Sequence, residues 1–370
     1  MGDDLRYWVG FNRISGVGAA RFALLLEAFG DLESAWKATA SDLREAGLGQ
    51  KTIQSILSTR EEMDLDRELE RIYEQGFSLL AINDRNYPAR LREIGLPPPL
   101  LYLKGELGEN DRLAAAIVGT RRATQYGKSV AREIAYVLAG CGVTIVSGLA
   151  RGIDGIAHQA AIDAGGRTIA VLGSGLDKIY PPEHRSLADK IAIQGSVVSD
   201  YPLGTKPEGR NFPPRNRIIS GLSLAVIVIE AGESSGALIT ADFSADQGRD
   251  VFAVPGDIYK PSSKGTNRLI QAGAHPLLKP EEVLEVLNLD LVSSQNDVTE
   301  QLPEDDIERK VFQAISKQPI HVDELQARCS LPVSTVNAAL AMLELKGRVK
   351  QVGGMNFVRI REARATYKVD

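Results

Sequence analysis

The chain has 370 residues, of which 44% are hydrophobic and 25% charged, with a formal net charge of −5 at pH 7. This length exceeds one typical core, so we expect two or three domains of an ordinary soluble protein. The charge balance excludes a uniformly basic nucleic-acid binder but allows a local basic patch. No apolar run approaches the roughly 20 residues of a membrane-spanning helix, and the acidic start lacks a signal-peptide pattern. We therefore expect a cytoplasmic protein without membrane contact.

Cysteines and histidines argue against disulfide and metal chemistry. The two cysteines, Cys141 and Cys329, fall in different predicted domains, and the four histidines lack the spacing of metal ligands. We expect neither a metal nor a cofactor.

Residues 1–75 are predicted to form short helices broken by glycines. Gly16-Val17-Gly18 and Gly47-Leu48-Gly49 each precede an apolar helical face. This repeat resembles paired helix-hairpin-helix motifs, as in sterile-alpha-motif (SAM)-like domains, in which backbone N–H groups approach a DNA phosphate. A tight turn within an accessory helical bundle explains the same pattern, and both interpretations stay open.

Residues 76–290 are predicted to form the central domain, including a lead-in segment up to about residue 112. The lead-in contains a short strand over 77–82 and the run Pro97-Pro98-Pro99, which favours an extended path along the edge of a sheet. Apolar runs then alternate with helical periodicity, which predicts an α/β domain with a Rossmann-like, mostly parallel sheet. The predicted strands are 114–118, 143–146, 168–172, 196–199, 224–229 and 251–254.

Glycines and arginines gather where these strands end. Arg121 follows the 114–118 strand and Arg151 follows the 143–146 strand. Because ligands of parallel sheets bind at the carboxyl ends of the strands, we expect the glycine-bearing ends to share one rim. The stretch 211–220, which we interpret as a loop, adds Phe212 and further arginines. Guanidinium groups that bind phosphate and a ring that stacks on a base suit single-stranded nucleic acid, although a solvated loop could have this composition by chance.

Two nucleotide-binding motifs are incomplete at this rim. Gly127-Lys128-Ser129 resembles the end of a P-loop, but Arg122 stands where the first glycine is required. Gly173-Ser174-Gly175 follows a strand as in a dinucleotide fingerprint, but Lys178 occupies the third glycine position. The sequence therefore disfavours P-loop binding of ATP and a nicotinamide cofactor.

Acidic residues of the central domain offer little support for catalysis. Asp154 fits the start of a helix and Asp177 a turn, and His158 is favoured as a hydrogen-bonded structural histidine. A metal-binding nuclease cluster would need several of Asp154, Asp177, Glu230, Asp242 and Asp257. With no nucleophile constellation, we predict no catalytic residue and a protein that is not an enzyme.

The last 80 residues are predicted to contain a linker and a small domain. Residues 291–304 are polar and lack periodicity, as linkers do, and 305–370 predict three helices and a hairpin over 349–360. This order resembles a winged helix, whose third helix often enters the DNA major groove. Here that helix opens with Ser334, Thr335 and Asn337 and without a base-reading arginine, so DNA binding and partner binding both stay open.

Several motifs of the central region share a pattern with known proteins. They are Gly119-Thr120-Arg121, Tyr126-Gly127, residues 147–154, the 173–182 turn with Tyr180-Pro181, residues 212–220, Glu230-Ala231, residues 235–241 and Val254-Pro255-Gly256. Together they resemble the DNA-processing protein A (Smf) family. The resemblance implies a bacterial cytoplasmic protein that binds single-stranded DNA taken up in natural transformation, protects it and helps load the RecA recombinase. It also implies a homodimer joined through the Rossmann-like domain and no catalytic reaction.

We therefore expect one nucleic-acid site on the rim. Backbone amides around three glycines would position phosphates, three arginines would supply charge and Phe212 would contact a base. The three glycines are Gly119, Gly148 and Gly236, and the three arginines are Arg121, Arg215 and Arg217. The full predicted set is Gly119, Thr120, Arg121, Gly148, Arg151, Phe212, Arg215, Asn216, Arg217 and Gly236.

Other interpretations remain open at this point. The predicted dimer face is Leu269, Ile270, Leu277 and Leu278, although packing inside one monomer explains these residues equally well. A nucleotide-cleaving enzyme on a Rossmann-like fold is one alternative function, and a winged-helix regulator that binds duplex DNA is another.

Overall fold

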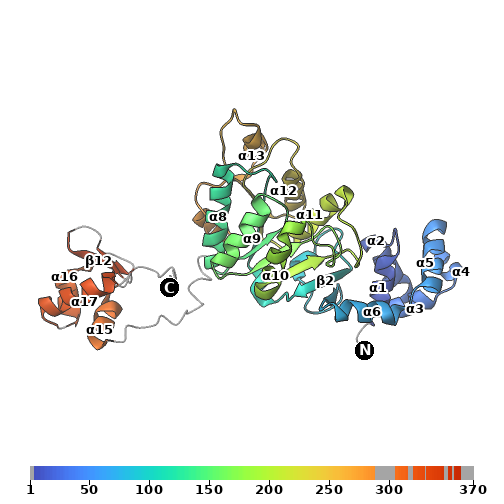
Figure 1. The fold of residues 1–370 in the computed structure, drawn as a ribbon, viewed down its shortest axis with the longest axis horizontal. Coiled ribbons are helices and arrows are strands. Elements are labelled where there is room, and N and C mark those ends of the chain that lie inside the picture. Colours follow the sequence, from blue (N-terminus) through green and yellow to red (C-terminus); the bar gives the residue numbers. More distant parts are fainter. Residues whose placement is uncertain are drawn as a thin grey trace. The chain divides into compact units, whose positions relative to one another are not determined.

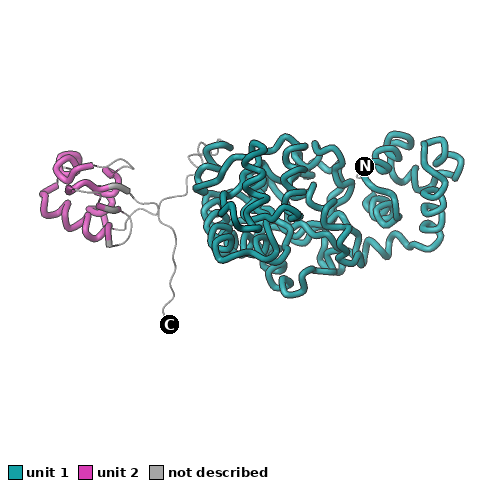
Figure 2. The backbone as a smooth tube through the Cα atoms, turned by 90° about the horizontal axis from the view of Figure 1, so that it is seen from above, with its two compact units in different colours: residues 1–293 teal, residues 294–370 magenta. Residues whose placement is uncertain are grey.

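The computed structural model describes residues 4–287, 305–315, 320–329, 331–345, 349–351 and 354–359. The chain divides into two compact units, Met1–Ser293 and Ser294–Asp370 (Figure 2). The predicted linker 291–304 lies outside the described residues. The predicted domain boundaries stay predictions.

Six helices open the first unit. They are α1 (Leu5–Arg13), α2 (Ala19–Phe29), α3 (Leu32–Lys37), α4 (Ala40–Glu45), α5 (Gln50–Glu62) and α6 (Leu65–Glu74). As the glycine pattern predicts, α2 and α5 begin directly after Gly18 and Gly49. The apolar core of this region, which includes Trp8, continues into Tyr102 and Val197 of the sheet, so the helices pack as part of the same unit.

A nine-stranded sheet forms the centre of the first unit. Its strands are β1 (Ser78–Ala81), β2 (Leu100–Gly105), β3 (Ala114–Val118), β4 (Thr144–Ser147), β5 (Thr168–Val171), β6 (Ser196–Ser199), β7 (Ala225–Val228), β8 (Asp250–Ala253) and β9 (His275–Pro276). The order is β1-β2-β6-β5-β4-β3-β7-β8-β9. Strands β3 to β9 pair in parallel, whereas β1 and β2 are antiparallel at one edge. The mostly parallel sheet and its lead-in edge are confirmed.

Helices cover both faces of this sheet (Figure 1). On one face Ile117, Ile145 and Ile227 pack against α8 (Gln125–Gly140) and α9 (Ile153–Asp163), with α10 (Arg185–Gln194) beside α9. On the other face the alternate residues Val118 and Val228 pack against α11 (Phe212–Gly221) and α12 (Gly236–Asp246). Successive strand residues point to opposite faces, so strands covered on both sides are apolar throughout. The short α7 (Ala89–Arg92), α13 (Lys264–Gln271) and α14 (Glu281–Val286) complete the unit.

The strand order reverses at β3. The chain adds β4, β5 and β6 on one side of β3, then returns to its other side with β7 and continues through β8. Ligands of open α/β sheets bind at the carboxyl ends of the strands that flank such a reversal. The topology therefore places a site beside Gly119 and Glu230, which follow β3 and β7.

The second unit is a winged helix, as predicted. Helices α15 (Asp306–Ala314), α16 (Val322–Cys329) and α17 (Val333–Leu345) pack over the strands β10 (Ile320–His321), β11 (Val349–Gln351) and β12 (Asn356–Arg359), in the order β10-β12-β11. Leu325, Val336 and Leu340 belong to its core. In the described part of the chain no helix is both long and apolar enough to span a bilayer.

Candidate nucleic-acid interface

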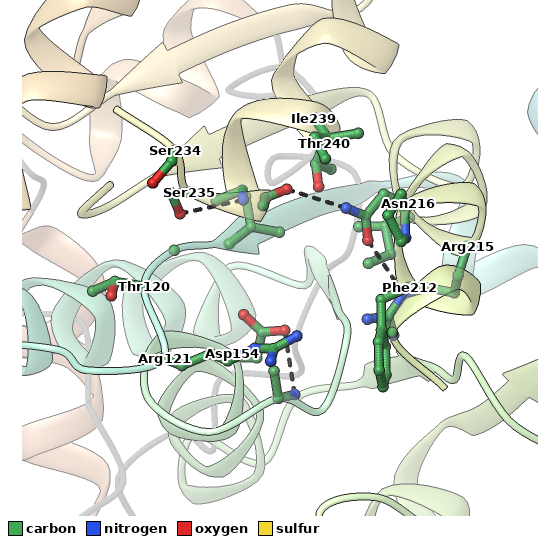
Figure 3. A pocket seen from close by; sticks show the side chains of 18 of the residues that line it. Thr120, Arg121, Asp154, Phe212, Arg215, Asn216, Ser234, Ser235, Ile239 and Thr240 are labelled. Carbon is green, nitrogen blue, oxygen red and sulfur yellow. Dashed lines mark hydrogen bonds between the residues drawn. The ribbon is translucent and has the colours of Figure 1, made fainter. Parts of the chain in front are cut away.

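A pocket of about 770 Å³ opens at the point where the strand order reverses (Figure 3). Its walls are the turn after β3, the loop after β7 and the first turns of α11 and α12. Seven predicted site residues line it: Gly119, Thr120, Arg121, Phe212, Arg215, Asn216 and Gly236. A smaller recess next to it is lined by Gly148 and Arg151 together with Arg121 and Phe212. The predicted meeting of the 119–121 turn with the 212–217 segment is thus present in the structure.

Arg121 presents its side chain to solvent at the mouth of the pocket. Its guanidinium carbon lies 5.4 Å from the centroid of the Phe212 ring, within the range of a cation–π contact. Within the described residues no carboxylate forms an ion pair with Arg121. Its positive charge is therefore available to an anion.

Phe212 stands at the start of α11, and the prediction of a loop over 211–220 is wrong. Pro213 and Pro214 occupy the first turn of the helix, where backbone N–H groups have no intrahelical partner and proline is tolerated. The half-buried Phe212 ring also lies 5.8 Å from Tyr180 and 5.9 Å from the Arg215 guanidinium. A helix start thus holds the aromatic ring against two cations.

Arg215 forms part of the pocket floor and is only 4% exposed. Its Nη1 donates to the carbonyl oxygen of Gly148 at 2.9 Å and to that of Val171, and burial lowers its pKa to about 10. A Cβ at Gly148 would lie 2.6 Å from the Arg215 Nη2. Gly148 therefore makes room for a guanidinium that ties α11 to the ends of β4 and β5.

Asp154, in the first turn of α9, holds the loop after β4. Its Oδ2 accepts hydrogen bonds from the N–H groups of Gly148 at 3.1 Å and Ala150 at 3.3 Å. Burial raises the pKa of this carboxyl, while the Arg215 charge opposes that shift. The Gly148 amide, which we expected to face a phosphate, is thus already engaged by Asp154.

Arg217 does not line the pocket. Its Nη2 lies 2.8 Å from Asp200 Oδ2, and both side chains are mostly buried. Residues two apart on an α-helix differ by about 200° around its axis, so Arg215 and Arg217 cannot face the same pocket. The expectation that both supply charge to one site overlooked this geometry.

Two further predicted residues, Asn216 and Arg151, bond to residues of neighbouring elements. Asn216 Nδ2 donates to the Gly236 carbonyl oxygen at 3.2 Å and so joins α11 to α12. Arg151 Nε lies 2.5 Å from Glu183 Oε1, with both side chains about half exposed, and its guanidinium carbon lies 6.0 Å from the Tyr180 ring. Arg151 is therefore at the recess but shares its charge with Glu183.

The N-terminus of α12 forms the opposite wall. Ser235 caps this helix by accepting from the Ala237 N–H at 3.4 Å, and a Cβ at Gly236 would meet no atom within 4 Å. Ser234 and Thr240 add hydroxyl groups to the wall (Figure 3). Orphan backbone donors and the helix dipole make such a helix start favourable for an anion. Sequence reasoning missed these hydroxyls, although a Ser-Gly pair after a strand is a recognisable helix start.

Glu230 anchors the turn that carries Arg121. Its carboxylate accepts from the N–H and the hydroxyl of Thr124, each at 2.9 Å, and its carbonyl oxygen accepts from Thr120 N at 2.7 Å. A Cβ at Gly119 would lie 2.6 Å from Ile153 Cγ1, so this glycine permits close packing of β3 on α9. The buried Glu230 therefore fixes the position of the 120–124 turn, which carries Arg121.

The acidic residues and histidines are the side chains considered for metal binding or catalysis. No group of three or more His, Cys, Asp or Glu side chains that could hold a metal occurs in the described part of the chain. His158 is buried, with Nδ1 2.6 Å from Thr168 Oγ1, as expected of a structural histidine. Burial lowers its pKa to about 3.

The predicted dimer face needs correction at Leu277. This side chain is 3% exposed and packs in the sheet's own core with Phe252 and Val283, so it is not available to a second subunit. Leu269 and Ile270 are half-buried, whereas Leu278 is exposed.

Known proteins resemble the chain over both units. Residues 78–288 match the model of DNA recombination-mediator protein A, and residues 296–355 match that of the DprA winged helix domain. Protein Smf of Synechocystis sp. is 37% identical over 95% of this chain and 98% of that protein. Protein Smf of Escherichia coli is 38% identical over 87% of each chain.

Two solved structures are similar as well. DNA processing protein A from Streptococcus pneumoniae superposes with a TM-score of 0.68 at 35% identity, over 76% of this chain and 98% of that one. The Helicobacter pylori protein, solved to give insight into its single-stranded DNA binding mode, superposes with a TM-score of 0.53 at 32% identity, over 58% of this chain and 96% of that one. Sequence and fold agree: this chain belongs to the DprA/Smf family of DNA recombination-mediator proteins.

Proposed function

We propose that the chain binds single-stranded DNA in the pocket at the rim and performs no chemical reaction there. The observation that carries this proposal is the juxtaposition of Arg121, which lacks an acidic partner among the described residues, with the Phe212 ring 5.4 Å away. A cation for phosphate beside an aromatic face for a base is the pairing that single strands require. The binding mode described for the Helicobacter pylori relative supports the same ligand class.

In this proposal the two walls hold different parts of a nucleotide. A phosphate lies between the Arg121 guanidinium and the first amides of α12 around Gly236, where both the charge and the helix dipole are favourable. A base lies against Phe212. Thr120 adds a hydroxyl to the wall, and Arg215 keeps the floor in place through its bonds to backbone carbonyls.

The charge of the pocket favours binding over cleavage. Among the described residues that line it, Asp154 is the one carboxylate, and this group is buried and bonded to two backbone amides. General acid–base hydrolysis needs a positioned pair of groups, and metal-assisted hydrolysis needs a ligand cluster. The pocket instead offers cations and backbone donors.

We further propose the cellular role that the family resemblance implies. The protein would bind single-stranded DNA entering the cytoplasm during natural transformation, protect it and help load RecA on it, acting as a homodimer. Contact with RecA and dimer formation are parts of this proposal that rest on family membership.

A length series separates this function from its rivals. Fluorescence anisotropy with oligothymidylates of increasing length, a duplex of the same length and a mononucleotide would be compared on the full chain and on residues 1–304. We expect affinity to rise with single-strand length and to survive the truncation. Turnover of the mononucleotide would point to an enzyme, and duplex-selective binding lost on truncation would point to a winged-helix regulator.

A further inference from the structure

The segment that joins β8 to α13 carries two apolar side chains in solvent. Tyr259 is 86% exposed and the adjacent Ile258 is 70% exposed. Because burial of an aromatic side chain contributes strongly to stability, a largely exposed tyrosine on a loop is typical of a contact surface.

This segment lies against the wall of the pocket. A Cβ at Gly232, which lines the pocket, would lie 3.4 Å from the carbonyl oxygen of Pro261. The N–H of Gly265 donates to the carbonyl oxygen of Ala231 at 2.8 Å. Tyr259 precedes Pro261 by two residues, a backbone span of at most about 7 Å. The exposed tyrosine is therefore a near neighbour of the proposed DNA site.

The base of the segment is held in place. Asn267 brackets Gly256 by accepting from its N–H at 3.1 Å and donating to its carbonyl oxygen at 2.9 Å. The hydroxyl of Tyr126 donates to the Pro255 carbonyl oxygen at 3.0 Å, and the N–H of Tyr259 donates to Asp257 at 3.0 Å. The Tyr259 ring is thus presented from a fixed base, which lowers the entropic cost of binding.

Two lysines follow the exposed tyrosine within five residues. The side chains of Lys260 and Lys264 are 65% and 48% exposed, and each lies 4.0 Å from a carboxylate, Asp257 and Glu233 respectively. Exposed pairs at this separation are weak, so the ammonium groups stay available to phosphate. An exposed aromatic ring on the same segment as basic side chains is the composition of a surface for single-stranded nucleic acid.

We propose that Tyr259 stacks on a base of the bound strand outside the pocket, so that one DNA strand runs from Phe212 across the start of α12 to the 254–263 segment. This inference rests on the proposed function, since it extends the same binding surface. An exposed apolar pair such as Ile258 and Tyr259 could also contact a protein partner. Continuity with the pocket and the two lysines that follow Tyr259 favour the DNA strand.

The test is a comparison of a mononucleotide with a long oligonucleotide on the full chain. Tyr259→Ala is expected to weaken binding of a 20-nucleotide oligothymidylate about five- to hundredfold, the range for loss of one stacked base. Binding of a mononucleotide, which we expect to occupy the pocket without reaching Tyr259, is expected to be unchanged. Tyr259→Phe keeps the ring and should bind like the unaltered protein. Tyr73→Ala removes another exposed tyrosine, on α6, and serves as the matched control.

Two outcomes distinguish the inference from the function on which it rests. If Arg121→Ala weakens binding of the long oligonucleotide while Tyr259→Ala does not, the pocket stands and the extension is overturned. If the unaltered chain shows no single-strand binding, the proposed function itself fails. A changed sedimentation coefficient of Tyr259→Ala at unaltered DNA affinity would assign the segment to a protein contact and also overturn the proposal. Photo-crosslinking of 5-iododeoxyuridine, placed along the strand, to Tyr259 would support it directly.

Discussion

The arginines on the turns after β3 and β4 differ from those on α11, although all four were predicted to serve one site at the rim of the sheet. Arg121 and Arg151 project into solvent, and the Arg121 guanidinium lies 5.4 Å from the centroid of the Phe212 ring. Arg215 and Arg217 turn inward, where one binds backbone carbonyls and the other pairs with Asp200.

This difference follows from the elements that carry the residues. The turns that carry Arg121 and Arg151 leave these two side chains exposed, whereas α11 buries both of its arginines, Arg215 against the ends of β4 and β5 and Arg217 against Asp200. We therefore predict that the inward arginines contribute to stability and the outward ones to binding. Measuring both the DNA affinity and the free energy of unfolding of each arginine variant tests this difference.

The largest expected effect is loss of stability on breaking the Arg217–Asp200 pair. Arg217→Ala leaves a mostly buried carboxylate without its partner, which should lower the free energy of unfolding by about 3 kcal/mol. Urea denaturation measures this change. Replacing both partners with apolar residues, as in Arg217→Met with Asp200→Leu, should restore most of the loss.

Measuring the DNA affinity of Arg217→Ala tests whether this arginine also contributes to binding. At a temperature where the variant stays folded, its single-strand affinity and salt slope should match those of the unaltered protein. A salt slope reduced by about one would mean that Arg217 does contact phosphate, and the division between inward and outward arginines would fail.

The next largest effect is expected on affinity. Arg121→Ala should remove the proposed charge-assisted contact to phosphate, worth about 1.5–3 kcal/mol or roughly ten- to hundredfold in the dissociation constant. The slope of affinity against salt should fall by about one counterion. The unfolding midpoint should not change because Arg121 is exposed and unpaired among the described residues. Arg132→Ala, at an exposed position of α8 that does not line the pocket, is the matched control.

The comparison also explains how much of the site could be predicted from the sequence. Strands β3 and β6 have the predicted bounds because an apolar run that ends at a polar or glycine residue fixes a buried strand. The rule that strand ends share a rim predicted that the 119–121 turn lies near Gly148, whereas Phe212 was added from the composition of its segment and from the family resemblance. The two-residue strands β9 and β10 were not predicted, since so short an element has no periodicity.

Side-chain direction was the part that the sequence could not supply. The stretch 211–220 contains two prolines, and composition alone does not distinguish a loop from a helix that starts with proline. Gly148 was interpreted as a phosphate-binding amide, but its contact with Arg215 joins residues 67 positions apart. Such long-range contacts depend on the folded arrangement. A motif therefore predicts where a site lies, but it does not predict the role of each residue in it.

The inward region should also respond to pH through His158. Burial, with the nearby charges of His184 and Arg215, lowers the pKa of this imidazole to about 3. The unfolded chain binds a proton there near pH 6.5, so between these values the unfolded state holds more protons and stability falls as pH falls. This group alone should remove about 2 kcal/mol between pH 7.5 and pH 5.

A variant isolates that contribution from other titrating groups. His158→Gln cannot take up the proton, so its free energy of unfolding should change less between pH 7.5 and pH 5 than that of the unaltered protein. Urea denaturation of both proteins at both pH values gives the difference. Equal pH dependence would show that His158 is protonated in the folded state, contrary to its burial.

The smallest effect is expected at Arg151, the outward arginine that has an acidic partner. Because the pair with Glu183 is about half exposed on both sides, Arg151→Ala should leave the unfolding midpoint unchanged. It should weaken single-strand binding less than Arg121→Ala does, since Arg151 must leave Glu183 to meet a phosphate. The reciprocal change, Glu183→Ala, frees the guanidinium and should strengthen binding and steepen the salt dependence. If Glu183→Ala weakened binding instead, the ion pair itself would be the feature that shapes the recess, and Arg151 would belong with the inward arginines.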